Sequence, residues 1–226
     1  SDVANINEEP ASYHLGFVIG PRINAGGRVG KSDLGARLLA SNDDHEVEMI
    51  SKRLDEFNSQ RKFIEQKTTE EAIEEIEKNQ LQQKPVIFVT KENWHPGVIG
   101  IVASRIKEIY NKPVAVIALE DGIGKASCRS INGVNFGAAV LNANIAGLLI
   151  GGGGHAMAAG FSVEENKISE LSDFICDKLT NDVAENSKFI TKYFYDILDI
   201  NSANMMLAHD ITKLEPYGVG NQKPRF

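Results

Sequence analysis

The spacing of apolar residues between Asn42 and Asn79 predicts one long helix. Apolar positions recur at intervals of three, four and seven residues with charged residues on both sides: Val47, Ile50, Leu54, Phe57 and Ile64. At a rise of 1.5 Å per residue, this helix would extend roughly 57 Å. A narrow apolar stripe on such a charged helix favours a connector between two domains, and it is also compatible with the seam of a coiled-coil dimer.

After this helix, the pattern changes to apolar runs of strand length. Pro85–Thr90 and Pro113–Leu119 are two such runs. Between them, Pro96 suits the first position of a helix whose apolar face carries Val98, Ile101, Val102, Ile106 and Ile109. This order of strand, helix and strand predicts a parallel βαβ unit with a right-handed crossover.

Further elements complete a compact α/β domain from about residue 83 to 184. A hairpin-like strand over 122–130 is followed by a helix that starts at Phe136 behind Asn135 as its cap. A glycine run then leads into the strand Gly160–Val163, and an amphipathic helix follows with Ile168, Leu171, Phe174, Ile175 and Leu179 on one side. The expected fold is therefore a mixed sheet flanked by helices and preceded by a long connector helix.

The N-terminal part reads as irregular or strand-like up to about residue 15. Gly16–Gly30 is expected to be a short apolar run that ends in a glycine-rich loop carrying two arginines, before Ser32 caps a short helix. Asp43-Asp44-His45 resembles a metal triad, but adjacent residues on a helix point in different directions. Acids in a first turn are explained by capping and by the helix dipole, so we predict no metal there.

The C-terminal part changes character again. Lys188–Ile200 alternates apolar and polar residues as a strand does, and Ser202–Leu214 reads as a short helix. The chain starts abruptly and stops within a motif at Phe226, so we expect it to be part of a longer protein.

Composition indicates a soluble protein with an uneven distribution of charge. The 226 residues carry a net charge of -7, and the segment from Asn42 to Asn79 holds twelve acids and six bases, so most of the acidity lies in the connector. The remaining basic and glycine-rich motifs are free to face phosphates. With no signal peptide, no membrane span and only Cys128 and Cys176, we expect a cytoplasmic location and reduced thiols.

The strongest candidate for chemistry is the run Gly151-Gly152-Gly153-Gly154-His155. Glycines leave the backbone N–H groups accessible, so an anion could contact Gly153, Gly154 and the His155 imidazole together. The alternative is an ordinary tight turn between a helix and a strand.

Four further positions are candidates for phosphate contact. Arg28, with Asn24 in the same glycine-punctuated stretch, and Arg129, with Ser130 beside it, each combine a charged fork with polar neighbours. The alternative for both arginines is a solvated or acid-paired surface residue.

Trp94 and His95 stand where a loop meets a helix N-terminus, a place that favours anions. For Trp94, a packing role is the alternative to base stacking.

The motifs together resemble the DHH phosphoesterases and, among them, the RecJ family of single-strand-specific 5′-to-3′ DNA exonucleases. The glycine run with its alanine-rich sequel resembles the GGGHxxAAG signature of the phosphoesterases, and four other motifs occur in the order expected for RecJ proteins: Gly20–Arg28, Trp94–Gly100, Cys128–Ser130 and Leu214–Asn221. Cys128 departs from the pattern, since related proteins often carry glycine there. The resemblance covers nearly the whole chain.

The resemblance implies a domain organisation. It makes residues 1–41 the end of the catalytic DHH domain, 42–82 the connector helix, 83–184 the DHH-associated domain and 185–226 the lead-in to an oligonucleotide-binding (OB) fold. It implies two divalent ions, Mn²⁺ or Mg²⁺, in the intact protein, with no catalytic or metal-binding residue in these residues because the Asp-His-His motif is not among them.

The resemblance further implies single-stranded DNA as substrate, a role in DNA repair and recombination, and single-strand-binding protein and a RecQ-type helicase as partners. Two other functions stay open at this point. One is a non-catalytic nucleic-acid-binding module, as in alanyl-tRNA synthetases. The other is a DHH phosphodiesterase that acts on short oligonucleotides or cyclic dinucleotides.

Overall fold

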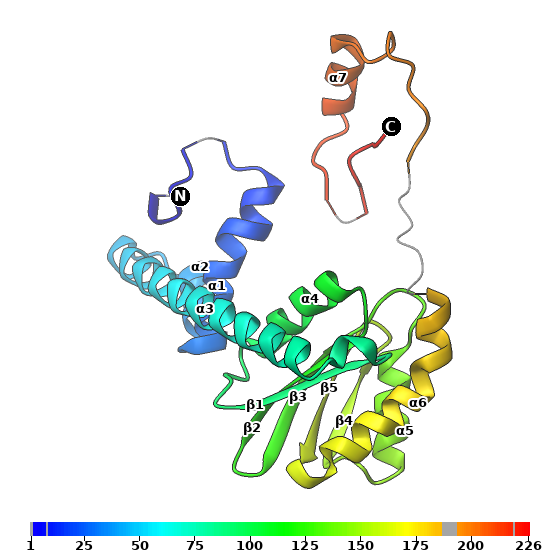
Figure 1. Ribbon diagram of the computed structural model, residues 1–226. Helices are drawn as coiled ribbons and strands as arrows, with labels where there is room; N and C mark the ends of the chain where they lie inside the picture. The colour runs from blue at the N-terminus through cyan, green and yellow to red at the C-terminus, as the bar shows by residue number, and fades with distance from the viewer. Residues whose placement is uncertain (1, 8, 187–193, 219) are drawn as a thin grey trace. The chain divides into compact units, whose positions relative to one another are not determined.

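The computed structural model describes residues 2–7, 9–186, 194–218 and 220–226. Contacts divide the chain into two compact units, residues 1–58 with 190–226 and residues 59–189, and the boundary falls within the long helix α3. Figure 1 shows the elements in chain order. Each unit is described by itself.

The second unit is built on a five-stranded mixed sheet with the order β1-β2-β3-β5-β4. Its strands are β1 (Ile87–Glu92), β2 (Val114–Glu120), β3 (Ile123–Arg129), β4 (Gly151–His155) and β5 (Ala158–Glu164). β1 and β2 are parallel, whereas β3 is antiparallel to both β2 and β5, and β4 is antiparallel to β5. The predicted parallel βαβ unit and the mixed sheet flanked by helices are confirmed.

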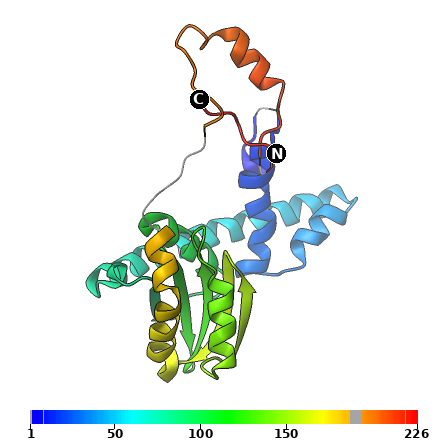
Figure 2. The same ribbon diagram turned by 90° about the vertical axis from the view of Figure 1, so that its right-hand side faces the viewer.

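One face of the sheet is covered by α5 (Phe136–Ile145) and α6 (Ile168–Asn186), which lie side by side in Figures 1 and 2. The side chains of this core come from all strands except β4 and include Phe88, Ile117, Cys128, Phe161 and Val163. α5 starts as expected, because the Asn135 side chain accepts a hydrogen bond from the Ala138 N–H at 3.0 Å. The small residues of α5 let it approach the sheet closely.

On the other face, α4 (Ile99–Tyr110) covers β1 and β2 and also contacts β3. There α4 packs with Ala72 and Ile76 of α3 (Asp44–Lys78) against Ile87, Val89, Val114, Val116 and Ala118. α4 begins three residues later than predicted, since Pro96 lies in a turn ahead of it. Ile109, expected on the apolar face of this helix, is exposed. Val98, Val102 and Ile106 are buried as expected, together with Ile99 and Ala103.

The predicted long helix is confirmed as α3, with 35 residues. Asp43 caps it, because its carboxylate accepts a hydrogen bond from the His45 N–H at 2.9 Å. Beyond residue 58, however, its buried side includes charged residues. The Glu65 carboxylate receives Arg61 Nη1 at 2.5 Å and Arg105 Nη2 of α4 at 2.6 Å. Glu65 is only 2% exposed, so a buried network of ion pairs links α3 to α4.

The first unit is helical in its N-terminal part. After a 3₁₀ turn η1 (Asp2–Ala4), the π-helical turn η2 (His14–Ile19) leads into α1 (Gly20–Val29), and α2 (Leu34–Ala40) follows. The expected glycine-rich loop is therefore wrong, since Gly20–Val29 is a helix. α2 starts after Asp33 rather than Ser32, and the Asp33 side chain forms no capping bond. The core here consists of Ala25, Leu34, Ile50, Leu54 and Phe57.

In the tail, α7 (Met205–Thr212) confirms the predicted short helix, and the Asn204 side chain accepts the Leu207 N–H at 3.0 Å. The strand predicted over Lys188–Ile200 lies partly outside the described residues, and the described residues 194–200 contain no strand. The short turns η3 (Leu81–Gln83) and η4 (Glu165–Lys167) complete the described elements.

Candidate functional site

The candidate site is the part of this second face that extends from β3, beside α4, across β5 to β4. Side chains alternate between the two faces of a strand, so β3, β5 and β4 direct every second residue toward this side. The inward residues of β3 and β5, such as Cys128 and Phe161, are buried under α5 and α6, whereas none of the outward ones is buried. The outward residues in the rows from Arg129 to Lys125 are called the open face: Lys125, Ser127, Arg129, Ala158, Gly160, Ser162, Gly151, Gly153 and His155. Ile123 and Glu164 continue this side of the sheet beyond Lys125.

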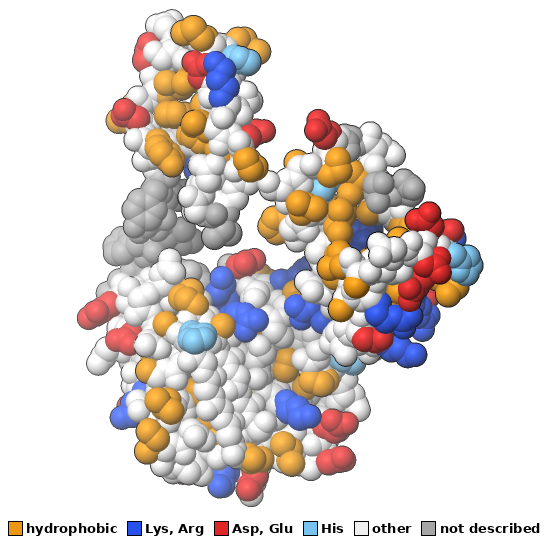
Figure 3. Space-filling model, turned by 180° about the vertical axis from the view of Figure 1, so that it is seen from behind, with side chains coloured by type: hydrophobic (Ala, Val, Ile, Leu, Met, Phe, Trp, Pro, Cys, Tyr) orange, Lys and Arg blue, Asp and Glu red, His pale blue; other side chains and the backbone are white. Residues whose placement is uncertain are grey.

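The pairing register arranges the open face in three rows that cross β3, β5 and β4. Neighbouring strands lie about 4.8 Å apart, and successive rows lie about 6.7 Å apart along the strands. The rows are Arg129–Ala158–His155, Ser127–Gly160–Gly153 and Lys125–Ser162–Gly151. Small residues therefore form a shallow floor with basic side chains at its margin. Seen from behind, the lower lobe shows a pale area of this kind with basic side chains beside it (Figure 3).

The glycine run forms the edge strand β4 and is not the loop that its composition suggested. Its glycines serve the two faces differently. A methyl group on Gly152 would lie 2.7 Å from the Phe161 Cβ, whereas a methyl group on Gly153 would meet nothing within 4 Å. Gly152 therefore permits close packing against the core, and Gly153 keeps the open face flat.

Arg129 lies at the end of β3 with its guanidinium held by backbone and hydroxyl groups. Its Nη1 donates to the Cys128 carbonyl at 2.8 Å and to the Ser127 hydroxyl at 3.2 Å. Gly100, in the first turn of α4, makes room for both side chains, since a methyl group there would lie 3.0 Å from the Ser127 Oγ. No carboxylate pairs with Arg129 in the described part of the chain. Its charge is therefore available to an anion.

Ser127 is the serine that lies beside Arg129 on the open face, and sequence reasoning missed it. Ser130, which was expected to contact phosphate beside Arg129, does not lie on this face. Ser130 is 1% exposed and donates its hydroxyl to the Val134 carbonyl at 2.7 Å, so it faces the core. The alternation of a strand could have found Ser127, because it lies two residues before Arg129 and hence on the same face. Burial also raises the pKa of the intervening Cys128 thiol, so this cysteine is an unreactive core residue.

His155 ends β4 in the same row as Arg129, with Ala158 between them. Its side chain is exposed, and its backbone lies against α5, since a methyl group on Gly137 would come within 2.7 Å of the His155 carbonyl oxygen. Arg129 pairs with Val114, the first residue of β2. Both residues thus stand where the parallel strands begin, not at the carboxyl ends where ligands of α/β sheets usually bind.

Trp94 and His95 lie near the carboxyl ends of β1 and β2. Trp94 is 6% exposed and its indole N–H donates to a Glu71 carboxylate oxygen at 2.9 Å, so it packs in this structure and offers no free ring face. His95 Nδ1 accepts the Gly97 N–H at 3.0 Å. Both residues line a cavity of about 580 Å³, together with Lys125 and the acids Glu92, Glu120 and Asp121.

Comparisons with known proteins agree on one family. Residues 83–181 match the DHHA1 domain family. The chain is 32% identical over 226 residues to the single-stranded-DNA-specific exonuclease RecJ of Bacillus subtilis, covering 99% of this chain and 28% of that protein. It is 33% identical to RecJ of Haemophilus influenzae, with 100% of this chain and 40% of that protein covered. A crystal structure of RecJ from Thermus thermophilus in complex with Mg²⁺ superposes with a TM-score of 0.80 at 28% identity, over 97% of this chain and 33% of that one.

Over nearly its whole length, the chain is a homologue of part of RecJ. It spans between about a quarter and two fifths of the length of the RecJ proteins named above. The resemblance to RecJ proteins is thus confirmed.

Two other site candidates, Arg28 and Asn24, lie in the first unit. Both are exposed residues of the helix α1 and do not belong to a loop. The open face consists only of residues of the second unit, so Arg28 and Asn24 remain predictions of phosphate contact from the RecJ resemblance.

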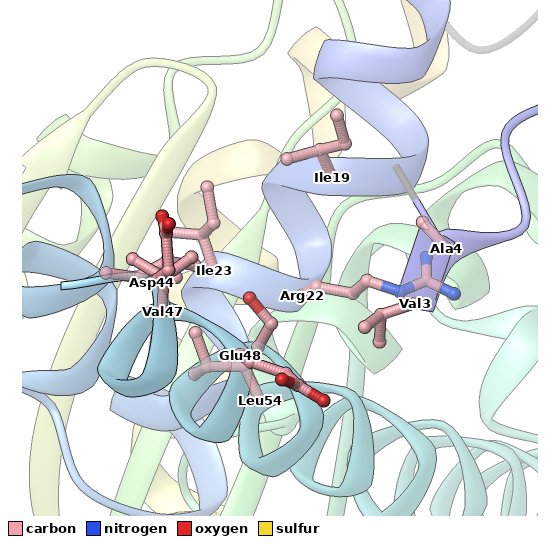
Figure 4. Close-up of a pocket in the computed structure, with 11 residues that line it drawn as sticks. Val3, Ala4, Ile19, Arg22, Ile23, Asp44, Val47, Glu48 and Leu54 are labelled. Carbon is pink, nitrogen blue, oxygen red and sulfur yellow. The ribbon is translucent and has the colours of Figure 1, made fainter. Parts of the chain in front are cut away.

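A separate cavity of about 340 Å³ lies among residues 3–54 of the first unit (Figure 4). Its wall is mostly apolar and includes Ile19, Ile23 and Leu54. Arg22, the one basic residue of this wall, donates from Nε to Asp55 at 2.8 Å and from Nη1 to the Val18 carbonyl at 2.8 Å. Because this charge is already paired, the cavity is a weaker candidate for a phosphate than the open face.

Crystallised RecJ proteins have been obtained in complex with Mg²⁺ and with Mn²⁺. Across the described residues of this chain, no group of three or more His, Cys, Asp or Glu side chains could hold a metal ion. The residues present therefore do not fit the metal site of the family, and no hydrolytic step is derived from them. No helix in this described part of the chain has the length and apolarity to cross a membrane.

Proposed function

We propose that the whole protein is a RecJ-type exonuclease that degrades single-stranded DNA, and that the open face of this chain holds the strand by its phosphates. The observation that carries the proposal is the row Arg129–Ala158–His155 with Ser127 beside it. It combines a guanidinium that pairs with no carboxylate of the described residues, a hydroxyl donor and an exposed imidazole on a floor of small residues. Such donors suit phosphate oxygens and read no base, as a nuclease without sequence preference requires.

The finer features of the proposal rest on the family. We propose 5′-to-3′ degradation by two divalent ions, Mn²⁺ or Mg²⁺, held by residues outside this chain, in DNA repair and recombination in the cytoplasm. Single-strand-binding protein and a RecQ-type helicase are the proposed partners. Residues 1–41, 42–82, 83–184 and 185–226 keep the proposed roles of catalytic-domain end, connector, DHH-associated domain and lead-in to the OB fold.

Binding of short single strands by Arg129→Ala and His155→Ala variants tests the proposal. Loss of one charge-assisted hydrogen bond should weaken binding by roughly 1.5 to 3 kcal/mol for all base sequences alike. Each lost phosphate contact should also lower the slope of log affinity against log salt by about 0.7. Titration of labelled oligonucleotides at several salt concentrations measures both effects.

Ser130→Ala serves as the matched control, because that hydroxyl faces the core. Thermal unfolding of each variant separates lost binding from lost folding. Unchanged affinity in Arg129→Ala and His155→Ala, or a loss of folding that accounts for the whole effect, would contradict the proposal.

A further inference from the structure

Lys125 is a basic residue of the open face that the proposed function does not yet use. It lies two residues before Ser127 and four before Arg129 on β3, so all three side chains leave the strand on the same side. Its side chain is exposed, and no ion pair is recorded for it within the described ranges. Lys91, which shares its row across β2, differs because its ammonium pairs with Glu71 at 3.2 Å.

Lys125 and Arg129 lie far apart along β3. Four residues of a strand span about 13 to 14 Å. The guanidinium of Arg129 is held at Ser127 and Cys128, over Gly100 of α4, whereas Lys125 lines the cavity near the opposite end of β3. The two cations therefore lie at different places along the strand. Successive phosphates of one DNA strand lie about 3.4 Å or more apart, so two phosphates of the same strand can reach the two cations.

The surface between these two cations allows a sugar–phosphate backbone to lie flat. Beside β3, the open face of β5 carries only Ala158, Gly160 and Ser162, and β4 adds Gly153 and Gly151. A methyl group on Gly160 would meet only the Ala126 carbonyl oxygen, at 3.3 Å. Between the rows of Arg129 and Lys125, β5 and β4 therefore direct no side chain longer than serine into this trough.

Charge also gives the trough an end. Past Lys125, the cavity wall carries Glu92, Glu120 and Asp121, which repel a phosphate. Lys125 is thus the last basic side chain of β3 before these acids.

We propose that Lys125 binds a second phosphate of the same single strand, so that the sugar–phosphate backbone runs lengthwise along β3 from Arg129 toward Lys125. This inference rests on the proposed function and adds the direction in which the strand crosses the sheet. Lys125 is then a positioning residue that acts only on ligands with more than one phosphate, whereas Arg129 acts on all of them.

The test compares Lys125→Gln with Lys178→Gln in the 226-residue chain, without divalent metal. Lys178 lies on α6, which covers the opposite face of the sheet, so its loss of charge is a matched control. Lys125→Gln should weaken binding of a short oligothymidylate about tenfold and leave binding of thymidine monophosphate unchanged. Arg129→Gln should weaken binding of both ligands.

A scan with single neutral methylphosphonate linkages locates the two contacts. In the wild-type chain, neutral linkages at two different positions should weaken binding. Lys125→Gln should be insensitive at one of them and Arg129→Gln at the other. The inference is overturned if Lys125→Gln binds oligothymidylate like Lys178→Gln, or if both variants lose sensitivity at the same linkage. The proposed function fails separately, if Arg129→Gln binds all ligands like the wild type.

Discussion

At the residue scale, the glycine run combines two requirements in neighbouring positions. Gly152 faces the core, where a methyl group would overlap Phe161 and approach Val140 to 3.1 Å. Gly153 faces the open side, where nothing lies within 4 Å. Composition alone makes these glycines look equivalent, but the pleat of β4 separates them into packing and binding positions.

We therefore expect Gly152→Ala to lower the free energy of unfolding by about 1 to 3 kcal/mol through overpacking. Gly153→Ala should leave that free energy within about 0.5 kcal/mol of wild type, as at an unconstrained surface site. Gly153→Val should fold and yet weaken single-strand binding, because its branched side chain would stand in the trough. Urea unfolding and oligonucleotide titration check these outcomes, and equal destabilisation by Gly152→Ala and Gly153→Ala would refute the assignment of faces.

At the element scale, carboxylates of α3 form ion pairs and a hydrogen bond with the sheet domain. Glu65 holds Arg105 of α4, and Glu71 accepts the Trp94 N–H and receives Lys91 at 3.2 Å. The Trp94 hydrogen bond and the nearby lysine charges hold the pKa of Glu71 below its ordinary value of about 4.5. A carboxylate whose pKa is lower in the folded state stabilises the fold above its ordinary pKa and loses that contribution as pH falls through the lowered value.

Glu71→Gln should accordingly lower the free energy of unfolding at neutral pH by roughly 1 to 2 kcal/mol, the range of a partly exposed charged hydrogen bond. The difference from wild type should shrink as the pH falls below about 4.5. Chemical denaturation across pH measures it, with Glu74→Gln, an exposed residue of the same helix, as the control. A difference that does not change with pH would mean that packing, not charge, links Glu71 to Trp94.

At the scale of the whole molecule, binding and hydrolysis are expected to separate. The open face supplies donors for phosphates, while the described residues supply no metal-binding group. The 226-residue chain should therefore bind single strands and release no nucleotides, with or without Mn²⁺ or Mg²⁺. Gel analysis of labelled oligonucleotides, with repurification to remove contaminating nucleases, tests this, and persistent metal-dependent release would contradict it.

The sequence by itself determined the elements whose signals lie in consecutive residues. The 3.6-residue spacing predicted α3, the apolar runs predicted β1 and β2, and Asn135 marked the start of α5. The RecJ family was also readable, because its motifs are contiguous strings. Local periodicity and capping need no knowledge of distant residues, so these predictions were confirmed.

Only the tertiary structure decided which side each candidate faces and what lies beside it. Glycine has low strand propensity, so β4 became visible only through its pairing with β5. The sequence gives no sign that Glu65 is buried and paired with Arg105 of α4. Ser130 was expected beside Arg129 at the site, but its hydroxyl faces the core. Lys125 and Ser127 share one face with His155 because β3 pairs with the hairpin of β4 and β5 in a particular register. Residues that are consecutive in the sequence do not encode the register between these distant segments.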